Sequence, residues 1–314
     1  MTKNVRNIYV LATMKLCLLT VNSRADKGPI KTNIVILCNH KCVINPELIA
    51  GFENYIFSKK LNFNISRIDI KGPSLPEKIE KQLQSKNPDI IFSIDHASAL
   101  LARQLLPESP IFIAQIAPSV SLENTNNIRG ISMEVPLAIQ LDWIKRTVPN
   151  AHSVGLIYST DLNRKKINQV LSLTKKMNLE LISEQISTPQ EFPQALKSVL
   201  RRADIILGLD DPVVITRETA KAILLSSFRQ RIPFVGLSRK WVKSGALFSL
   251  ESNDFSVGKQ SGKIIEMMLK NKIHRNSSIQ YPIDINYILN MKTARHMKID
   301  ISSDLIKQAE KIYE

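Results

Sequence analysis

Short apolar runs alternate with longer amphipathic segments through most of the chain. The apolar runs predict buried strands, and segments whose apolar residues recur every three or four positions predict helices. In the first part of the chain we expect strands at residues 32–38, 63–70, 88–95 and 110–117, and helices at residues 46–61, 75–87 and 97–106. Strands joined by helices of this length need crossover connections, which produce a parallel, doubly wound sheet.

The same alternation is repeated in the second part of the chain. After an apolar segment at 128–133, we expect helices at 136–148, 163–178, 188–203, 217–231 and 254–271, and strands at 152–159, 179–186, 204–210, 232–238 and 246–251. Thr188 and Glu191 have the spacing of a helix capping box. The segment 279–291 is expected to return as an extended hinge.

Together these patterns predict an α/β protein of two doubly wound parallel-sheet lobes, with a hinge and a cleft between them. We place a crossover between the lobes near residues 118–135. The first lobe is expected at residues 26–120, completed by a C-terminal crossover segment. The second lobe, the hinge and the tail are expected at residues 121–314.

Ligands of open parallel sheets bind beyond the carboxyl ends of the strands, so two facing lobes place both sets of strand ends around one cleft. The candidate ligand-binding residues are polar side chains at or just beyond predicted strand ends: Asn39, His40, Asp95, His96, Ser98, Gln115, Tyr158, Ser159, Asp161, Asp210, Asp211, Ser238, Arg239, Trp241 and Glu251. Asp210 is suited to a ligand ammonium and Arg239 to a carboxylate. Each candidate has a structural alternative, since Asp211 can cap a helix and Trp241 can pack in the core.

The stretch Cys38-Asn39-His40-Lys41-Cys42 combines two thiols with an imidazole, as metal and redox sites do. The chain has three cysteines and five histidines, with no second pair at ligand spacing. Three residues separate these cysteines, whereas redox sites and zinc knuckles use C-x-x-C. A metal site, a disulfide and two ordinary residues at a strand-to-loop boundary are the alternatives. No cofactor is expected.

The composition, with 44% hydrophobic and 23% charged residues, is typical of a soluble globular protein. A net charge of +15 raises the question of a nucleic-acid or membrane partner. The basic residues are spread over predicted helix faces, however, and aromatic residues make up only 6% of the chain. We therefore expect a solvated basic surface and no nucleic-acid groove.

The first 25 residues have the pattern of a signal segment. Lys3 and Arg6 precede an apolar run at 8–21, and residues 23–25 fit a small-x-small cleavage site. Lys15 interrupts the apolar run, and a buried first helix or a misassigned start is the alternative. No later apolar stretch reaches the roughly 18 residues of a membrane span. We expect an exported, periplasmic or extracytoplasmic protein with no integral span in the mature chain.

Familiar nucleotide-binding and catalytic motifs are missing. Gly258, Gly262 and Lys263 resemble part of a phosphate-binding loop, but the Walker spacing is wrong and the segment falls within a predicted helix. The first strand is not followed by G-x-G-x-x-G, and the chain has no G-x-S-x-G elbow. A non-enzymatic binding role is favoured.

Several motifs resemble the substrate-binding proteins of ABC transporters, in the subfamily that includes tryptophan- and tyrosine-binding members. They are HSVGLIYSTDLNRKKINQVLSLTKKMNLEL, ADIILGLDDPVV, IPFVGLSRKWVKSGALFSLESNDFSVGKQSGKI and YILNMKTARHMKI, with PDIIFSIDHASALLA in the first lobe. The resemblance implies a type I periplasmic-binding-protein fold, export or lipid anchoring, and a small ligand enclosed by hinge closure. It also implies that Asn39 and His40 lie in one wall of the cleft, with the cysteines incidental or disulfide-bonded.

The chain departs from this family at places that bear on the ligand. Ser238 stands where amino-acid-binding members tend to carry an acidic residue, and Asp95 and His96 are bulkier than the residues usual in their loop. We expect an ABC-type uptake protein for a small, polar, amino-acid-like ligand, with a permease partner. The alternative is a periplasmic sensing protein that docks on a membrane signalling receptor. A transcriptional regulator fits poorly, because only 31 residues precede the first strand.

Overall fold

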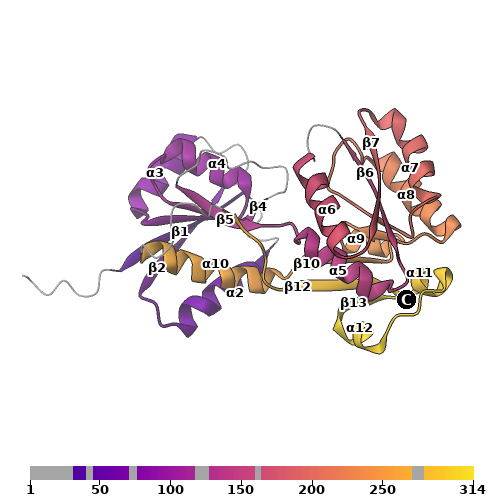
Figure 1. Ribbon diagram of the computed structural model, residues 1–314. Coiled ribbons are helices and arrows are strands. Elements are labelled where there is room, and N and C mark those ends of the chain that lie inside the picture. Colours follow the sequence, from indigo (N-terminus) through magenta and orange to yellow (C-terminus); the bar gives the residue numbers. More distant parts are fainter. Residues whose placement is uncertain (1–30, 40–44, 71–75, 117–126, 160–163, 271–278) are drawn as a thin grey trace, which may run out of the picture.

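The computed structural model describes residues 31–39, 45–70, 76–116, 127–159, 164–270 and 279–314. These residues form two lobes side by side, each a largely parallel sheet with helices on both faces (Figure 1). The predicted fold class, an α/β protein with two doubly wound sheets, is confirmed. The expected signal segment, residues 1–25, lies outside the described residues.

The first lobe is built on a six-stranded, fully parallel sheet in the order β11-β5-β4-β3-β1-β2. Its strands are β1 (Thr32–Asn39), β2 (Phe63–Ile70), β3 (Ile90–Ser93), β4 (Ile111–Ile116), β5 (Ile128–Ser132) and β11 (Ile279–Gln280). The helices of this lobe are α2 (Pro46–Ser58), α3 (Pro76–Lys86), α4 (His96–Leu105) and α10 (Asp254–Leu269).

Strand β1 is buried on both faces, which explains its continuous apolar sequence. Ile34 and Ile36 belong to the hydrophobic cluster beneath α2 and α10. Val35 and Leu37 belong to the cluster beneath α3 and α4. All four side chains are inaccessible to solvent. The strand therefore holds together both helical layers of the lobe.

The second lobe has a seven-stranded sheet in the order β13-β12-β10-β9-β8-β6-β7, parallel except for the antiparallel pair β10 and β12. Its strands are β6 (Ser153–Ser159), β7 (Glu180–Ile186), β8 (Ile205–Leu207), β9 (Phe234–Gly236), β10 (Phe248–Ser252), β12 (Ile285–Asn290) and β13 (Ala309–Tyr313). Its helices are α5 (Leu137–Thr147), α6 (Arg164–Lys176), α7 (Phe192–Leu200), α8 (Arg217–Gln230), α9 (Arg239–Lys243), α11 (Met291–Met297) and α12 (Ser303–Gln308).

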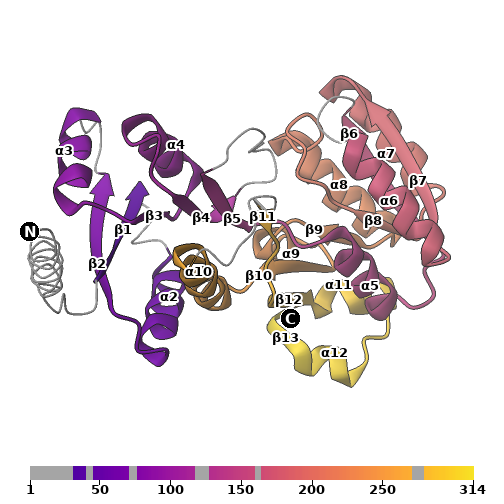
Figure 2. The ribbon, with the colours of Figure 1, turned by 60° about the vertical axis from the view of Figure 1, so that its left-hand side comes forward.

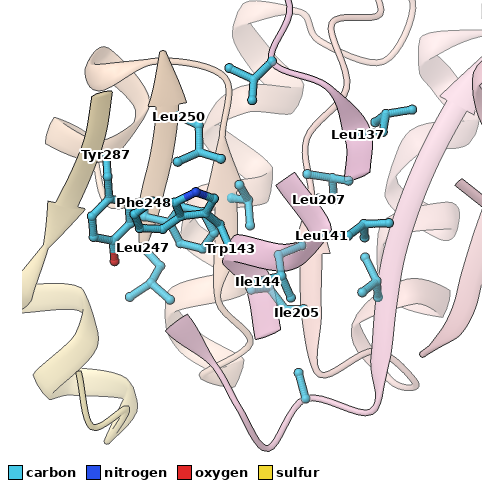
Figure 3. Close-up of a cluster of buried hydrophobic side chains, with 14 of the residues drawn as sticks. Leu137, Leu141, Trp143, Ile144, Ile205, Leu207, Leu247, Phe248, Leu250 and Tyr287 are labelled. Atoms are coloured by element: carbon cyan, nitrogen blue, oxygen red, sulfur yellow. The ribbon is translucent and has the colours of Figure 1, made fainter. Parts of the chain in front are cut away.

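An aromatic cluster fixes α5 against this sheet (Figure 3). The rings of Trp143 and Tyr287 stack with their centroids 4.4 Å apart, and Phe248 lies 5.6 Å from Tyr287. Such pairs add to the free energy gained by burying their area. The cluster joins α5 to β10 and β12, and each of these three elements adjoins a segment that crosses between the lobes.

The chain crosses between the lobes three times: at residues 133–136, at Asn253, and at residues 281–284. Strand β5 pairs with β4 of the first lobe, so the first crossing follows Ser132. The expected boundary at residue 120 lies too early, because an apolar segment alone does not show which sheet it joins. Figure 2 shows α10 beside α2 in the first lobe, although about two hundred residues separate them along the chain.

Close approach of α2 and α10 requires glycine. A Cβ atom at Gly258 would lie 1.9 Å from the Leu48 carbonyl oxygen, and a Cβ atom at Gly51 would lie 1.9 Å from that of Phe255. Gly262 faces the ring of Tyr55, where a Cβ atom would lie 2.8 Å from Cδ1. The glycines that resemble part of a phosphate-binding loop therefore serve helix packing.

Other local predictions differ from the structure. Helices α9, α11 and α12 and strand β13 are not predicted, because each is short and lacks clear periodicity. The Thr188 side chain does not cap the following helix; its hydroxyl and the Ser187 N–H instead donate to the Glu191 carboxylate, and a 3₁₀ turn at Pro189–Glu191 precedes α7. Among the described residues, no helix combines the length and the hydropathy that crossing a membrane requires.

Candidate ligand-binding cleft

A cavity of about 480 Å³ lies between the two lobes, beside the crossing segments. Its lining comes from α2 and β4 of the first lobe, the start of α10, and β10, α9, β12 and β13 of the second. The lining residues are Asn45, Glu47, Gln115, Met133, Leu237, Ser238, Arg239, Leu250, Glu251, Ser252, Asp254, Asn286 and Glu310. The volume falls within the usual range of small-molecule sites.

A chain of hydrogen bonds runs along the first-lobe wall of this cavity. Asn45 Nδ2 donates to Gln115 Oε1 at 2.9 Å, and Gln115 Nε2 donates to Asp254 Oδ1 at 2.9 Å. Asn45 directly precedes α2, Gln115 lies in β4, and Asp254 is the first residue of α10. The three side chains therefore connect the strand ends of the first lobe to the second crossing.

The second-lobe wall carries an ion-pair network around Arg239. Its Nε donates to Glu251 at 2.9 Å, its backbone N–H donates to the same carboxylate, and Glu310 lies 3.5 Å from the guanidinium. The hydrogen bond to Glu251 is the main reason that the pKa of Arg239 is raised. The positive charge of Arg239 is therefore matched by two glutamates.

The electrostatic environment of Asp254 is unusual for an aspartate. Burial, followed by the negative charges of Glu47 and Glu251, raises the pKa of its carboxyl group, although Arg239 and the bond from Gln115 act in the opposite direction. Burial disfavours the charged form of a carboxyl group, and like charges nearby add to this effect. Carboxyl groups whose pKa is raised in this way are common in binding sites.

A second pocket of about 260 Å³ adjoins this cavity and shares Met133, Leu237 and Leu250 with it. Its remaining lining is mostly apolar or glycine: Glu134, Val135, Gln140, Gly208, Leu209, Asp210, Val235 and Gly236. Glu134 is paired with Lys166 at 2.9 Å, so Asp210 contributes the exposed carboxylate of the pocket. The two pockets, one mostly apolar and the other acidic, share part of their lining and are together called the cleft.

Five of the predicted site residues line this cleft. Gln115, Ser238, Arg239 and Glu251 line the larger cavity, and Asp210 lines the smaller pocket. They come from both lobes, as the argument from strand ends predicts. The structure thus brings together part of the predicted set.

Three other predicted residues serve local structure. Asp95 caps α4, accepting the backbone N–H of Ser98 at 2.9 Å, and the Ser98 hydroxyl donates to the Asp95 carbonyl. Asp211 is fully buried and accepts the backbone N–H groups of Ser159 and Val213 at 2.8 and 3.0 Å. These carboxylates line neither pocket.

The remaining predicted residues in the described part of the chain line neither of these two pockets. Ser159 is buried at the end of β6, and the Tyr158 hydroxyl donates a long hydrogen bond, 3.4 Å, to the side-chain oxygen of Gln185 in β7. Trp241 packs on Phe234 and lines a separate groove between α8 and α9. Nδ1 of His96 is buried without a hydrogen-bond partner among the described residues.

Only part of the motif Cys38-Asn39-His40-Lys41-Cys42 lies within the described residues. Cys38 is fully buried at the end of β1 and disulfide-bonded, and both other cysteines lie outside the described residues. His40 and Asp161 also lie outside them, as does the side chain of Asn39. Among the described residues, no three histidine, cysteine or acidic side chains are grouped so that they can hold a metal ion.

Several cavity residues were missed by the sequence argument: Asn45, Glu47, Asp254, Asn286 and Glu310. Asn45 and Glu47 begin a helix that follows a strand, so extending the strand-end rule by a few residues identifies them. Asp254 begins the helix after β10 and is found in the same way. Asn286 and Glu310 come from β12 and β13, whose position beside the cleft depends on the third crossing.

Two α/β lobes, three crossings and a cavity lined from both sides define the type I periplasmic-binding architecture. Residues 59–313 match the model of the ABC transporter substrate binding protein family, and the chain belongs to that family. The predicted resemblance is confirmed. The family consists of substrate-binding proteins.

The chain is 24% identical over 241 residues to a tyrosine-binding protein of Clostridioides difficile (strain R20291), covering 74% of this chain and 69% of that protein. A ligand-free, open structure of a substrate-binding protein with adhesive properties from Clostridium difficile superposes with a TM-score of 0.69 at 19% identity, covering 90% of this chain and 99% of the other. A domain from Streptococcus pneumonia in complex with L-Trp superposes with a TM-score of 0.55, at the same identity and coverage. These structures share the fold of this chain.

Proposed function

We propose that this protein is exported and acts as the substrate-binding component of an ABC-type uptake system. In this role it binds a small, polar, amino-acid-like ligand in the cleft between its lobes. The observation that carries the proposal is the cavity of about 480 Å³ lined by side chains of both lobes. A ligand that contacts both walls favours the closed arrangement by its differential affinity for that state.

The crossing segments are suited to a hinge. Three short segments connect lobes that otherwise have separate hydrophobic clusters. The aromatic cluster of Trp143, Phe248 and Tyr287 keeps the second lobe rigid next to these segments. Motion is therefore expected at the crossings, with each lobe moving as a unit.

The relatives support the choice of ligand class. One relative is named as tyrosine-binding, and one structural neighbour holds L-Trp. The acidic lining of the cavity is suited to the ammonium group that amino acids and their derivatives carry. Ser238, Asp95 and His96 are expected to depart from the pattern of the amino-acid-binding members, so the ligand itself is to be found by a screen.

A thermal-shift screen against amino acids, amines, peptides, nucleosides and simple anions tests this proposal. A ligand present at about 100 times its dissociation constant adds roughly 2.7 kcal/mol of stability, which raises Tm measurably. The proposal fails if no compound raises Tm.

A matched pair of variants then locates the binding site. Glu251→Gln alters a glutamate of the cleft that is paired with Arg239. Glu184→Gln alters a glutamate on β7 of the second lobe that is likewise paired with an arginine, Arg202. We expect Glu251→Gln to reduce the ligand-induced shift and Glu184→Gln to preserve it. Equal shifts in both variants and the wild type indicate binding elsewhere and refute the cleft as the site.

A further inference from the structure

The charge of the cleft is opposite to that of the whole chain. The chain carries a net charge of +15. Among the described residues, however, the larger cavity is lined by four carboxylates, Glu47, Glu251, Asp254 and Glu310, against one guanidinium, Arg239. Asp210 adds another carboxylate at the adjoining pocket. The cleft therefore has a surplus of negative charge on an otherwise basic protein.

The positive charge in the cavity, that of Arg239, is already paired with carboxylates. Arg239 is hydrogen-bonded to Glu251 and lies beside Glu310. The ion pairs of the described residues include no partner for Glu47 or Asp254. Most of the surplus charge therefore belongs to Glu47 and Asp254, on the first-lobe wall, and the rest lies where Glu251 and Glu310 share Arg239.

The side-chain amides on this wall each donate one N–H to a neighbour along it. The Asn45 amide donates to Gln115, and the Gln115 amide donates to Asp254. A ligand carboxylate that approached this wall would be repelled by the carboxylates of Glu47 and Asp254, which outweigh the remaining N–H of each amide. A ligand ammonium or guanidinium would find the acceptors that it needs.

Helix ends supply a simpler reason for two of these carboxylates. Glu47 and Asp254 lie in the first turns of α2 and α10, where acidic side chains interact favourably with the helix dipole. Both helix ends nevertheless bring these carboxylates to one wall of the same cavity, where burial and the charges of Glu47 and Glu251 raise the pKa of Asp254.

The adjoining pocket is suited to the apolar part of a ligand. Met133, Leu209, Val235, Leu237 and Leu250 give it apolar walls, and its volume of about 260 Å³ suits a small aliphatic or aromatic group. Burial of such a group stabilises a complex by about 25 cal/mol per Å² of apolar area removed from water. The two pockets share Met133, Leu237 and Leu250, so an apolar body in this pocket lies next to the acidic cavity that is suited to an amine.

We propose that the ligand of this cleft is an organic cation, a small molecule with an ammonium or guanidinium group on an apolar body and no free carboxylate. This inference rests on the function proposed above and narrows its ligand class. It separates this chain from the tyrosine- and tryptophan-binding proteins that it resembles. The substrate of the uptake system is then an amine of the kind left when an amino acid loses its carboxyl group.

Calorimetric titration of the full chain with matched compounds tests the inference. Phenethylamine, phenylalanine and 3-phenylpropanoate share a phenyl body and differ in charge. Tyramine and tyrosine, tryptamine and tryptophan, agmatine and arginine, and cadaverine and lysine extend the comparison to other bodies. We expect at least one amine to bind about tenfold or more tightly than its parent amino acid, since the carboxylate of the parent is repelled. Binding of the amine should weaken as salt is added.

Variants on the first-lobe wall test the cause. Glu47→Gln and Asp254→Asn should each weaken the binding of the amine by roughly five- to tenfold. Glu77→Gln is the matched control, because Pro76-Glu77 begins α3 as Pro46-Glu47 begins α2, and Glu77 lies outside the cleft. Using two separate site variants guards against the misfolding of one of them.

The outcomes distinguish this inference from the proposed function. Amino acids that bind in the cleft as tightly as their amines, or more tightly, overturn the inference and leave the proposed function standing. Amine binding that neither Glu47→Gln nor Asp254→Asn weakens also overturns it. If no compound of this panel or of the wider screen binds, both proposals fail.

Discussion

The contact between α2 and α10 gives a sharp prediction for the substitution Gly258→Ala. An added Cβ would lie 1.9 Å from the Leu48 carbonyl oxygen and 2.7 Å from the Phe52 backbone nitrogen. A carbon and an oxygen in close contact normally stay at least about 3.3 Å apart, so α10 must move outward by more than roughly 1 Å. Because both obstructing atoms belong to the backbone of α2, no side-chain rotation relieves the clash.

The size of the effect follows from two opposing terms. Overpacking of this kind costs about 1–3 kcal/mol, and the two backbone clashes place Gly258→Ala at or above the upper end of that range. Alanine gains about 1 kcal/mol over glycine from helix propensity. We expect a net loss of about 2 kcal/mol, which corresponds to a fall in Tm of roughly 4–8 °C.

Thermal unfolding followed by circular dichroism measures this loss. Lys263→Ala, at an exposed position of the same helix, is the control and should leave Tm nearly unchanged. Gly258→Ala should also weaken ligand binding, because α10 begins with Asp254 in the cleft. A variant with the Tm of the wild type, or a higher one, refutes the proposed need for glycine at this contact.

Three further predictions concern other parts of the molecule. Asp211→Ala leaves the backbone N–H groups of Ser159 and Val213 without their acceptor and should cost about 2–3 kcal/mol in urea unfolding, whereas unchanged stability would show that they find other partners. Because the pKa of Asp254 is raised in the folded state, this group should add to the stability of the ligand-free protein as pH falls through that pKa. Asp254→Asn should remove this gain when Tm is measured between about pH 4 and pH 7, and identical pH profiles of Tm in the variant and the wild type would contradict the reasoning. Affinity capture from membranes should recover a permease, and recovery of a receptor kinase without a permease would favour a sensing role.

The sequence predicted the fold well because the first lobe has a simple pattern. Residues Ile34 to Leu37 are apolar on both faces of one strand, as only a buried parallel strand requires. Predicted and observed bounds coincide for β2 and differ by a few residues for most other elements. A C-terminal crossover segment that completes the first lobe was expected, but α10 was not identified as part of it, because helix periodicity shows that a helix is amphipathic without showing which sheet it covers.

The candidate site was predicted less completely, for reasons visible in adjacent residues. Asp210 faces the cleft, whereas Asp211 is fully buried and accepts three backbone hydrogen bonds. A sequence of two aspartates does not show which one turns inward. Glu310 depends on the pairing of β13 with β12, a contact made after the third crossing. Residues at strand ends could be identified from the pattern, and residues brought in by long-range pairing could not.

A crystal structure of the protein with the tightest-binding compound of the screen tests the central claim most directly. We expect the compound between the lobes, in contact with Gln115 or Asp254 on one side and with Arg239 or Glu251 on the other, and the cleft narrower than in the ligand-free protein. A compound bound in the groove beside Trp241, or held by one lobe with the cleft unchanged, would contradict ligand binding by hinge closure.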